Sequence, residues 1–213
     1  MIRFLRGRWD CIPALQEMPK YKSYHIPGHL YFVTAAIVGR KKILSDPAIA
    51  GIVLETLDFL RKEGRMRLFS YVIMPEHLHL IVLPLEYNGK KQTISDLMRD
   101  FKKFTSKRII EKLKEQKRES LLNFFFKSAK AYKRQMYKVW QDSFFDENVF
   151  TQDFLNQKIQ YIHYNPVRKG MVDEPEDYSL SSARNFVFEG EGVLELDELG
   201  ADGLRDTIPK TSV

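Results

Sequence analysis

Residues 66–83 have the sequence MRLFSYVIM-PE-HLHLIVL, in which two apolar runs flank a Pro-Glu pair. Both runs are rich in aromatic and branched side chains, which favour extended backbone, and a proline between two such runs is typical of a tight turn. We therefore predict two adjacent antiparallel strands, Met66–Met74 and His77–Leu83. If both faces of the second strand are apolar, it lies deep in the sheet.

Further elements are predicted on both sides of this hairpin. His29–Val38 is rich in strand-forming residues, and apolar residues at helical spacing predict a helix over residues 47–63, with Gly64 as its C-terminal cap. A long helix begins near Thr93, with an apolar stripe on one side and a strongly positive polar side.

The rest of the chain completes the order of elements. We expect further helix over residues 112–135, a short final strand over Tyr137–Phe145, and a helix over Gln152–Asn165. Pro166 should end that helix, because the residue before a proline disfavours α geometry. The order matches the βαββαβ unit of ferredoxin-like folds. The predicted fold class is therefore α+β, with a ferredoxin-like βαββαβ antiparallel sheet and an added C-terminal helix.

The composition restricts the class of protein. The chain has 213 residues, 44% of them hydrophobic, which is enough for one substantial core. Its single cysteine, Cys11, excludes an internal disulfide and a zinc site of several thiolates. No apolar run approaches the roughly 20 residues that cross a bilayer, and the N-terminus interleaves charged with apolar residues. We therefore expect a cytoplasmic protein with no membrane partner.

Charge is distributed unevenly along the chain. The net charge is +6, but residues 1–172 carry 31 basic and 17 acidic residues, whereas residues 173–213 carry 3 and 11. Residues 101–140 hold 13 basic and 3 acidic residues, interleaved with eight aromatic ones. Sites for single-stranded nucleic acid combine cationic grooves with stacking rings, although these rings could also be core residues below a solvated lysine face. The basic part favours a phosphate-bearing partner.

The segment His77-Leu-His79 places two imidazoles two residues apart on a predicted strand. Such residues project from the same face, about 7 Å apart at the backbone, so both rings can bind one divalent ion. Two hydrogen-bonded histidines at a strand edge are the alternative interpretation, and the pair alone does not decide between them.

Tyr161 and Asn165 are four residues apart on a predicted helix and therefore share a face. A tyrosine hydroxyl can be a nucleophile that forms a covalent intermediate if a cation, held by two imidazoles and an amide oxygen, polarises the electrophile. From composition alone, Tyr161 is one of ten tyrosines and an ordinary core or surface aromatic. His163 and Tyr164 are alternative candidates for the nucleophile, but they project from other faces of the helix.

Several stretches together resemble a known family. They are YVIMPEHLHLIV (71–82), MRDFKKFTS (98–106), WQ (140–141), YIHYNPVRKGMV (161–172) and PEDYSLSSA (175–183). In order and spacing they are similar to the REP-associated tyrosine transposases (RAYTs). These are single-tyrosine HUH transposase-like proteins, related to the small insertion-sequence transposases that act on single-stranded DNA. The resemblance spans about residues 24–186.

The resemblance implies an HUH nuclease fold whose added C-terminal helix bears the catalytic tyrosine, with Mg²⁺ or Mn²⁺ as cofactor. It implies Tyr161 as the nucleophile, His77 and His79 as metal ligands, and Asn165 as the third ligand. The implied reaction cleaves one DNA strand and leaves a 5′-phosphotyrosine and a free 3′-hydroxyl. The residues that we predict to contact DNA are Arg99, Lys102, Lys103, Lys107, Trp140 and Arg168.

These observations predict three parts of the chain. They are an N-terminal lead-in (1–23), a catalytic domain (24–186) with a basic helical insertion at about 112–137, and an acidic tail (187–213), which we expect to be mobile. The predicted function is a metal-dependent endonuclease and strand transferase for single-stranded or hairpin DNA, acting as a monomer or homodimer. The alternatives are a catalytically silent nucleic-acid-binding module of the same fold, and a metal-dependent phosphohydrolase that uses activated water.

Overall fold

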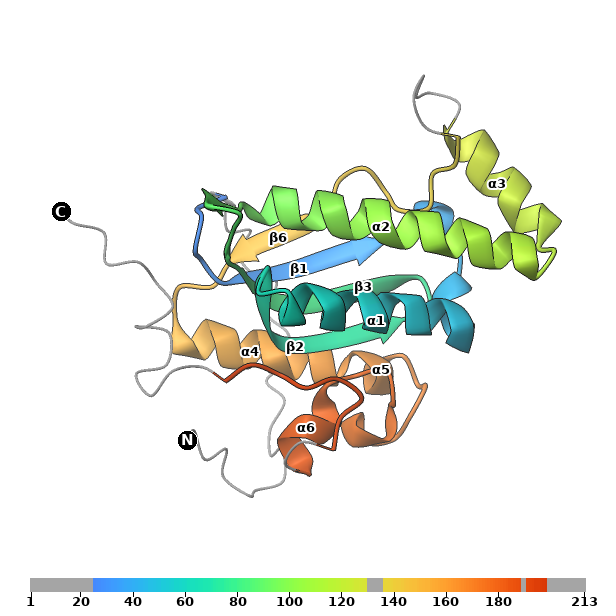
Figure 1. Ribbon diagram of the computed structural model, residues 1–213. Helices are drawn as coiled ribbons and strands as arrows, with labels where there is room; N and C mark the ends of the chain where they lie inside the picture. Colours follow the sequence, from blue (N-terminus) through green and yellow to red (C-terminus); the bar gives the residue numbers. More distant parts are fainter. Residues whose placement is uncertain (1–24, 130–135, 189–190, 199–213) are drawn as a thin grey trace.

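The main sheet has four antiparallel strands in the order β2-β3-β1-β6 (Figure 1). They are β1 (Tyr31–Ala36), β2 (Met66–Met74), β3 (His77–Pro84) and β6 (Phe145–Asn148). The computed structural model describes residues 25–129, 136–188 and 191–198. Strands β1 and β3 are central, and the pairing is that of a ferredoxin-like sheet. The predicted α+β fold class is confirmed.

Helices cover both faces of this sheet (Figure 1). Helices α1 (Pro47–Lys62) and α2 (Ile94–Glu115) pack on one face, and α4 (Gln152–His163) packs on the other. The short elements are η1 (Val38–Arg40), η2 (Ile43–Ser45), β4 (Glu86–Tyr87), β5 (Lys90–Lys91), α3 (Glu119–Ala129), α5 (Asn165–Arg168), η3 (Pro175–Asp177) and α6 (Ala183–Val187). Among the described residues, no helix has the length and apolar character that crossing a bilayer requires.

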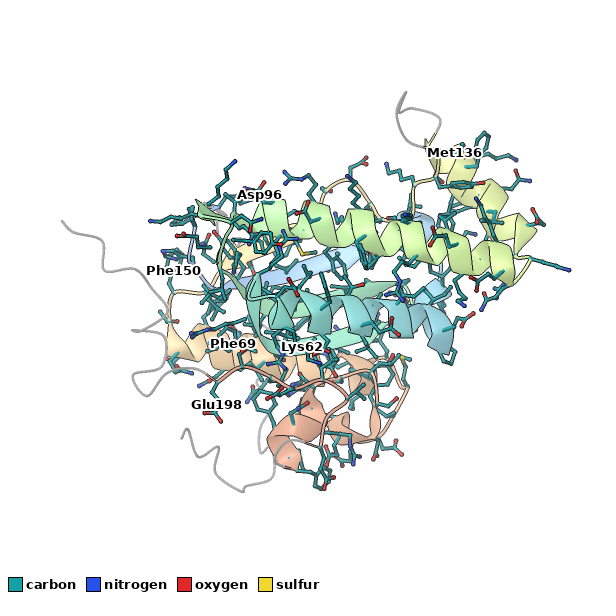
Figure 2. All side chains as sticks on the ribbon, in the orientation of Figure 1. Lys62, Phe69, Asp96, Met136, Phe150 and Glu198 are labelled. Atoms are coloured by element: carbon teal, nitrogen blue, oxygen red, sulfur yellow. The ribbon has the colours of Figure 1, made fainter. Side chains whose placement is uncertain are left out.

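Local capping fixes where the two long helices begin. The Asp46 carboxylate accepts a hydrogen bond from the Ala48 N–H at 2.9 Å, at the start of α1. Thr93 and Asp96 form a capping box at the start of α2, where Asp96 is labelled in Figure 2. Both caps satisfy backbone N–H groups that have no partner within the helix. The predicted starts of both helices are confirmed.

Alternation along β3 divides its side chains between two cores. Leu78, Leu80 and Val82 belong to the core below α1 and α2, whereas Ile81 belongs to the core below α4. Since side chains two residues apart on a strand share a face, His79 lies on the same side as Ile81. The histidine pair therefore faces the side of the sheet that α4 covers.

The predicted final strand, Tyr137–Phe145, is wrong in its bounds. The observed strand β6 begins at Phe145, and Trp140 makes only an isolated bridge to Ile37. The Trp140 indole N–H donates to Thr105 Oγ1 of α2 at 2.9 Å, in the core. Packing on α2, and not strand pairing, thus determines where this aromatic segment lies. Both kinds of packing favour aromatic and branched residues, so the composition does not distinguish them.

The helix after Gln152 also ends differently from the prediction. Helix α4 stops at His163, and Pro166 does not end it but lies in the first turn of the next helix, α5. Proline is tolerated there because the N–H groups of the first helical turn have no acceptor within the helix, so the N–H that proline lacks costs no hydrogen bond.

Two other differences concern connections. The helical stretch predicted for residues 112–135 is divided between the end of α2 and α3, and residues 130–135 lie outside the described part. The β4–β5 hairpin was not predicted. Its turn residues Asn88 and Gly89 have φ angles of 52° and 70°, and an Asn-Gly pair is the sequence signal for such a turn.

The C-terminal segment covers the outer edge of β2. The Ser182 N–H donates to the Tyr71 carbonyl at 3.0 Å, and the Asp197 N–H donates to the Leu68 carbonyl at 2.8 Å. The Leu68 N–H in turn donates to Asp197 Oδ2 at 2.8 Å. These bonds satisfy backbone groups that an uncovered edge strand would expose. Residues 191–198, which fall in the segment expected to be a mobile tail, therefore pack against the sheet.

His163 is fully buried between α4 and the edge of β2, and its Nε2 lies 3.0 Å from Ser182 Oγ. Burial lowers its pKa to about 3, because the charged imidazolium is desolvated there. Below the ordinary pKa of 6.5, the unfolded chain binds a proton that the folded chain excludes. We therefore expect the contribution of His163 to the free energy of unfolding to be constant above pH 6.5. As the pH falls from 6.5 towards 3, the free energy of unfolding should decrease by about 1.4 kcal/mol per pH unit.

Urea unfolding at a series of pH values below 6.5 measures this loss. The His163→Gln variant should show a shallower decrease of the unfolding free energy with falling pH than the wild type. Parallel pH dependences in the two proteins would refute the role of His163.

Candidate active site

The two predicted histidines lie next to each other at one end of β3. His77 Nε2 and His79 Nε2 are 3.1 Å apart, and both side chains are buried. His79 Nδ1 lies 2.7 Å from Thr34 Oγ1 of the neighbouring strand β1, a hydrogen bond that fixes the ring. His77 Nδ1 lies 3.3 Å from Glu76 Oε1. The ring nitrogens that face each other are therefore those not used by Thr34 or Glu76.

Helix α4 and the start of α5 bring the other two predicted residues to this pair. The Asn165 Nδ2 atom is 3.1 Å from His79 Nε2, and the Tyr161 and His79 rings are 5.2 Å apart between centroids. Phe32 of β1 also packs edge-on against the Tyr161 ring. The structure thus places His77, His79, Tyr161 and Asn165 in one site, although they are up to 88 positions apart in the chain.

These four residues line a pocket of about 710 Å³. Other polar residues of its wall are Thr34, Arg40, Glu76, Glu147, Lys158 and Lys169. Lys158 Nζ forms an ion pair with Glu147 Oε2, and both side chains are almost completely buried. The Lys158 ammonium also lies 4.3 Å from the centroid of the Phe32 ring. This ion pair connects α4 with β6 next to Tyr161.

Burial favours the neutral form of both histidines. Burial lowers the pKa of His79 well below 6.5, and the nearby His77 and Lys158 lower it further. Burial also lowers the pKa of His77, although the Glu76 carboxylate partly opposes this shift. Neutral imidazoles offer nitrogen lone pairs, which is the form that binds metal ions.

The donor set fits a divalent cation. Two donors at right angles around a cation, each about 2.1 Å from it, are about 3 Å apart, and the 3.1 Å between the histidine Nε2 atoms is close to this value. Turning the Asn165 amide by half a turn brings Oδ1 to the position 3.1 Å from His79 Nε2. In the described part of the chain, no three His, Cys, Asp or Glu side chains form a metal-binding group. The third protein donor would therefore be the amide.

Arg168 fixes the position of Tyr161. Its guanidinium donates to the Tyr161 carbonyl at 2.6 Å and lies 4.6 Å from the centroid of the Tyr161 ring. Of the residues predicted to contact DNA, Arg168 is the one that touches the candidate nucleophile.

The other residues predicted to contact DNA lie away from the pocket. Helix α2, which carries Arg99, Lys102, Lys103 and Lys107, packs on the opposite face of the sheet from α4. Arg99 pairs with Asp96, whereas Lys103 and Lys107 are exposed.

Two of these residues, Lys102 and Trp140, have their side chains engaged within the protein. The Lys102 ammonium donates to three backbone carbonyls, those of Gln141, Asp142 and Ser143, and burial lowers its pKa to about 8. Trp140 is 4% exposed, so no base can stack on its ring. These two side chains are structural parts of the α2 side of the molecule.

Several residues of the pocket were not predicted from the sequence. Lys158 carries a weak signal, since it precedes Tyr161 by three positions and so shares its helix face. Arg40 belongs to a basic Arg-Lys-Lys run directly after the first strand, which a search for basic loops would have found. Thr34 and Glu147 carry no such signal, because only the sheet register brings them to the site.

The four-stranded ferredoxin-like sheet, with helices on both faces, is the fold of a family of transposases. The family model for IS200-like transposases matches residues 23–130, which is more than half of the chain, and the chain belongs to this family. The resemblance predicted from the sequence is confirmed at the level of family and fold.

The solved structures that are similar to the chain include two transposases. A REP-associated tyrosine transposase bound to a REP hairpin has 20% sequence identity and a TM-score of 0.53, over 86% of this chain and 96% of that one. At this identity, the likeness shows the fold. A putative transposase from Deinococcus radiodurans R1 has 19% identity and a TM-score of 0.38, over 68% of this chain and 95% of that one. No curated protein matches the sequence.

Proposed function

We propose that the protein is a metal-dependent endonuclease and strand transferase for single-stranded DNA next to a hairpin, with Tyr161 as its nucleophile. The observation that carries this proposal is that one pocket contains Tyr161, the histidine pair and Asn165. Membership of the IS200-like transposases agrees with this activity. The hairpin is suggested by the solved transposase of the same fold, which is bound to one.

In the proposed reaction, the Tyr161 hydroxyl oxygen attacks the phosphorus of a DNA phosphodiester. A bond from this oxygen to phosphorus forms while the bond from phosphorus to the 3′ oxygen breaks. The hydroxyl proton of Tyr161 is released, and the departing 3′ oxygen takes up a proton, so the products are a 5′-phosphotyrosine and a 3′-hydroxyl. Because one phosphodiester replaces another, the 3′-hydroxyl of a second strand can reverse the step, which amounts to strand transfer.

His77, His79 and Asn165 would hold the Mg²⁺ or Mn²⁺ ion, which when bound stabilises charge that develops on the scissile phosphate. The residues of the chain itself orient this site. Thr34 fixes the ring of His79 through its 2.7 Å hydrogen bond, and Arg168 holds Tyr161 from the exposed side. Such preorganisation avoids a loss of side-chain freedom during the reaction.

The experiment that tests this proposal uses the full chain and a labelled DNA hairpin with single-stranded flanks, in the presence of Mg²⁺, Mn²⁺ or EDTA. We expect a covalent protein–DNA adduct that survives denaturation, and a released strand whose 3′-hydroxyl a polymerase can extend, with either metal but not with EDTA. Cleaved DNA without an adduct would instead support the phosphohydrolase. DNA binding without either product would support the catalytically silent module.

A further inference from the structure

Two exposed cations, Arg40 and Lys169, line the same pocket as the histidine pair. Arg40 follows β1 at the end of η1, and Lys169 directly follows α5. Among the described residues, no carboxylate lies within 4.0 Å of either charged group.

Most other arginines of the described chain are neutralised by an acidic partner. Those in ion pairs are Arg61, Arg65, Arg99, Arg108, Arg118 and Arg184. Within the pocket, Lys158 is also neutralised, by Glu147. Arg40 and Lys169 therefore leave exposed positive charge in the wall of the pocket, where an anion can reach it.

The loop that presents Arg40 is held in a fixed shape. Gly39 and Arg40 have φ angles of 62° and 50°, and a left-handed conformation at arginine is kept only where the surroundings enforce it. The Phe124 ring of α3 closes over Gly39, because a Cβ atom there would lie 2.5 Å from Phe124 Cζ. The Val38 N–H also donates to the Val139 carbonyl at 2.8 Å.

These contacts give the basic insertion a structural part in the site. Helix α3 lies within this insertion, and its Phe124 packs on the loop that carries Arg40. The Lys41 ammonium lies 4.5 Å from the centroid of the same Phe124 ring. The loop thus presents Arg40 to the pocket without a large loss of backbone freedom on binding.

We propose that Arg40 and Lys169 bind backbone phosphates of the DNA strand that enters the pocket. This inference rests on the proposed function, because it takes the anion to be a nucleic acid. It places the phosphate contacts on the α4 side of the sheet, and not on the exposed lysines of α2. Arginine suits this role because its planar guanidinium can donate two hydrogen bonds to one phosphate.

The test measures binding of a fluorescein-labelled single strand of mixed sequence by anisotropy, in EDTA and over a range of salt concentrations. In EDTA, binding is separated from cleavage. We expect Arg40→Ala and Lys169→Ala each to weaken binding roughly tenfold at low salt and to reduce the slope of log affinity against log salt by about 0.7. The double variant should lose about twice that slope, and Arg40→Lys should retain most of it.

Matched controls are Arg67→Ala and Lys91→Ala. Both side chains are exposed. In the sheet, Arg67 of β2 lies opposite Leu83 of β3, and Leu83 is about 20 Å from His77 along the strand at ~3.3 Å per residue. Unchanged salt slopes in Arg40→Ala and Lys169→Ala, as in the controls, would overturn the inference and leave the proposed function intact. Reduced slopes in a protein that forms no adduct would support the inference and contradict the proposed function.

Discussion

Replacing Tyr161 by phenylalanine is expected to abolish the covalent protein–DNA adduct, a loss of roughly 10³-fold or more, while the fold and DNA binding persist. The change removes only the proposed nucleophilic oxygen, which forms no hydrogen bond with any described residue. The ring contacts with Phe32 and His79 and the hydrogen bond from Arg168 to the backbone all remain. Denaturing gels of the labelled hairpin measure the adduct, and anisotropy in EDTA measures binding.

Tyr164→Phe is the matched control for this prediction. Tyr164 lies three residues further along, at the end of α4, and does not line the pocket. This variant should form the adduct at the wild-type rate. If Tyr161→Phe formed as much adduct as Tyr164→Phe, Tyr161 would not be the nucleophile.

The Lys158→Met substitution is expected to lower the free energy of unfolding by about 3–5 kcal/mol, because it leaves the Glu147 carboxylate buried without its partner. Both side chains are at most 3% exposed, so solvent compensates poorly for the lost ammonium. The ion pair also joins α4 to β6, so its loss should loosen the helix that carries Tyr161. Urea unfolding followed by circular dichroism measures the effect.

Two further variants separate this mechanism from a general loss of packing. Lys158→Met combined with Glu147→Leu removes both charges and should recover most of the lost stability. Lys62→Met breaks the ion pair with Asp58, in which Lys62 is 66% exposed, and should cost at most about 1 kcal/mol. The explanation fails if Lys158→Met is as mild as Lys62→Met, or if the double variant is no more stable than the single one.

The sequence predicted the parts of the fold that depend on local chemistry. The two apolar runs on either side of Pro75-Glu76 and the helical spacing of apolar residues over 47–63 are visible in any short window of the chain. The final strand was misplaced because aromatic residues near Trp140 satisfy two different demands, pairing in a sheet and packing on a helix. Local patterns do not distinguish these demands.

The candidate site was predictable in its chemical groups but not in its surroundings. His77, His79, Tyr161 and Asn165 could be found because each pair has a spacing that suits its element. The wall of the pocket depends instead on which strands are neighbours. Glu147 reaches the site only because β6 pairs with β1, opposite Phe32, and no spacing in the chain encodes that register.

The charge pattern showed a similar limit. The sequence identified an excess of basic residues along α2, and the structure places that helix on the far side of the sheet from the pocket. The exposed cations at the pocket, Arg40 and Lys169, come from two short basic segments, Arg40–Lys42 and Arg168–Lys169, which lie far apart in the chain. Charge counted along a sequence therefore indicates a kind of partner, whereas charge counted around a pocket indicates where it binds.

The most direct test of the central claim is to locate the DNA attachment by mass spectrometry. The adduct formed with the labelled hairpin and Mn²⁺ is digested with nuclease and trypsin, which releases the peptide of residues 159–168. This peptide contains Tyr161, His163 and Tyr164, so fragmentation must assign the nucleotide to one of them. Our account predicts a nucleotide joined through phosphate to Tyr161, and a nucleotide on His163, on Tyr164 or on another peptide would contradict it.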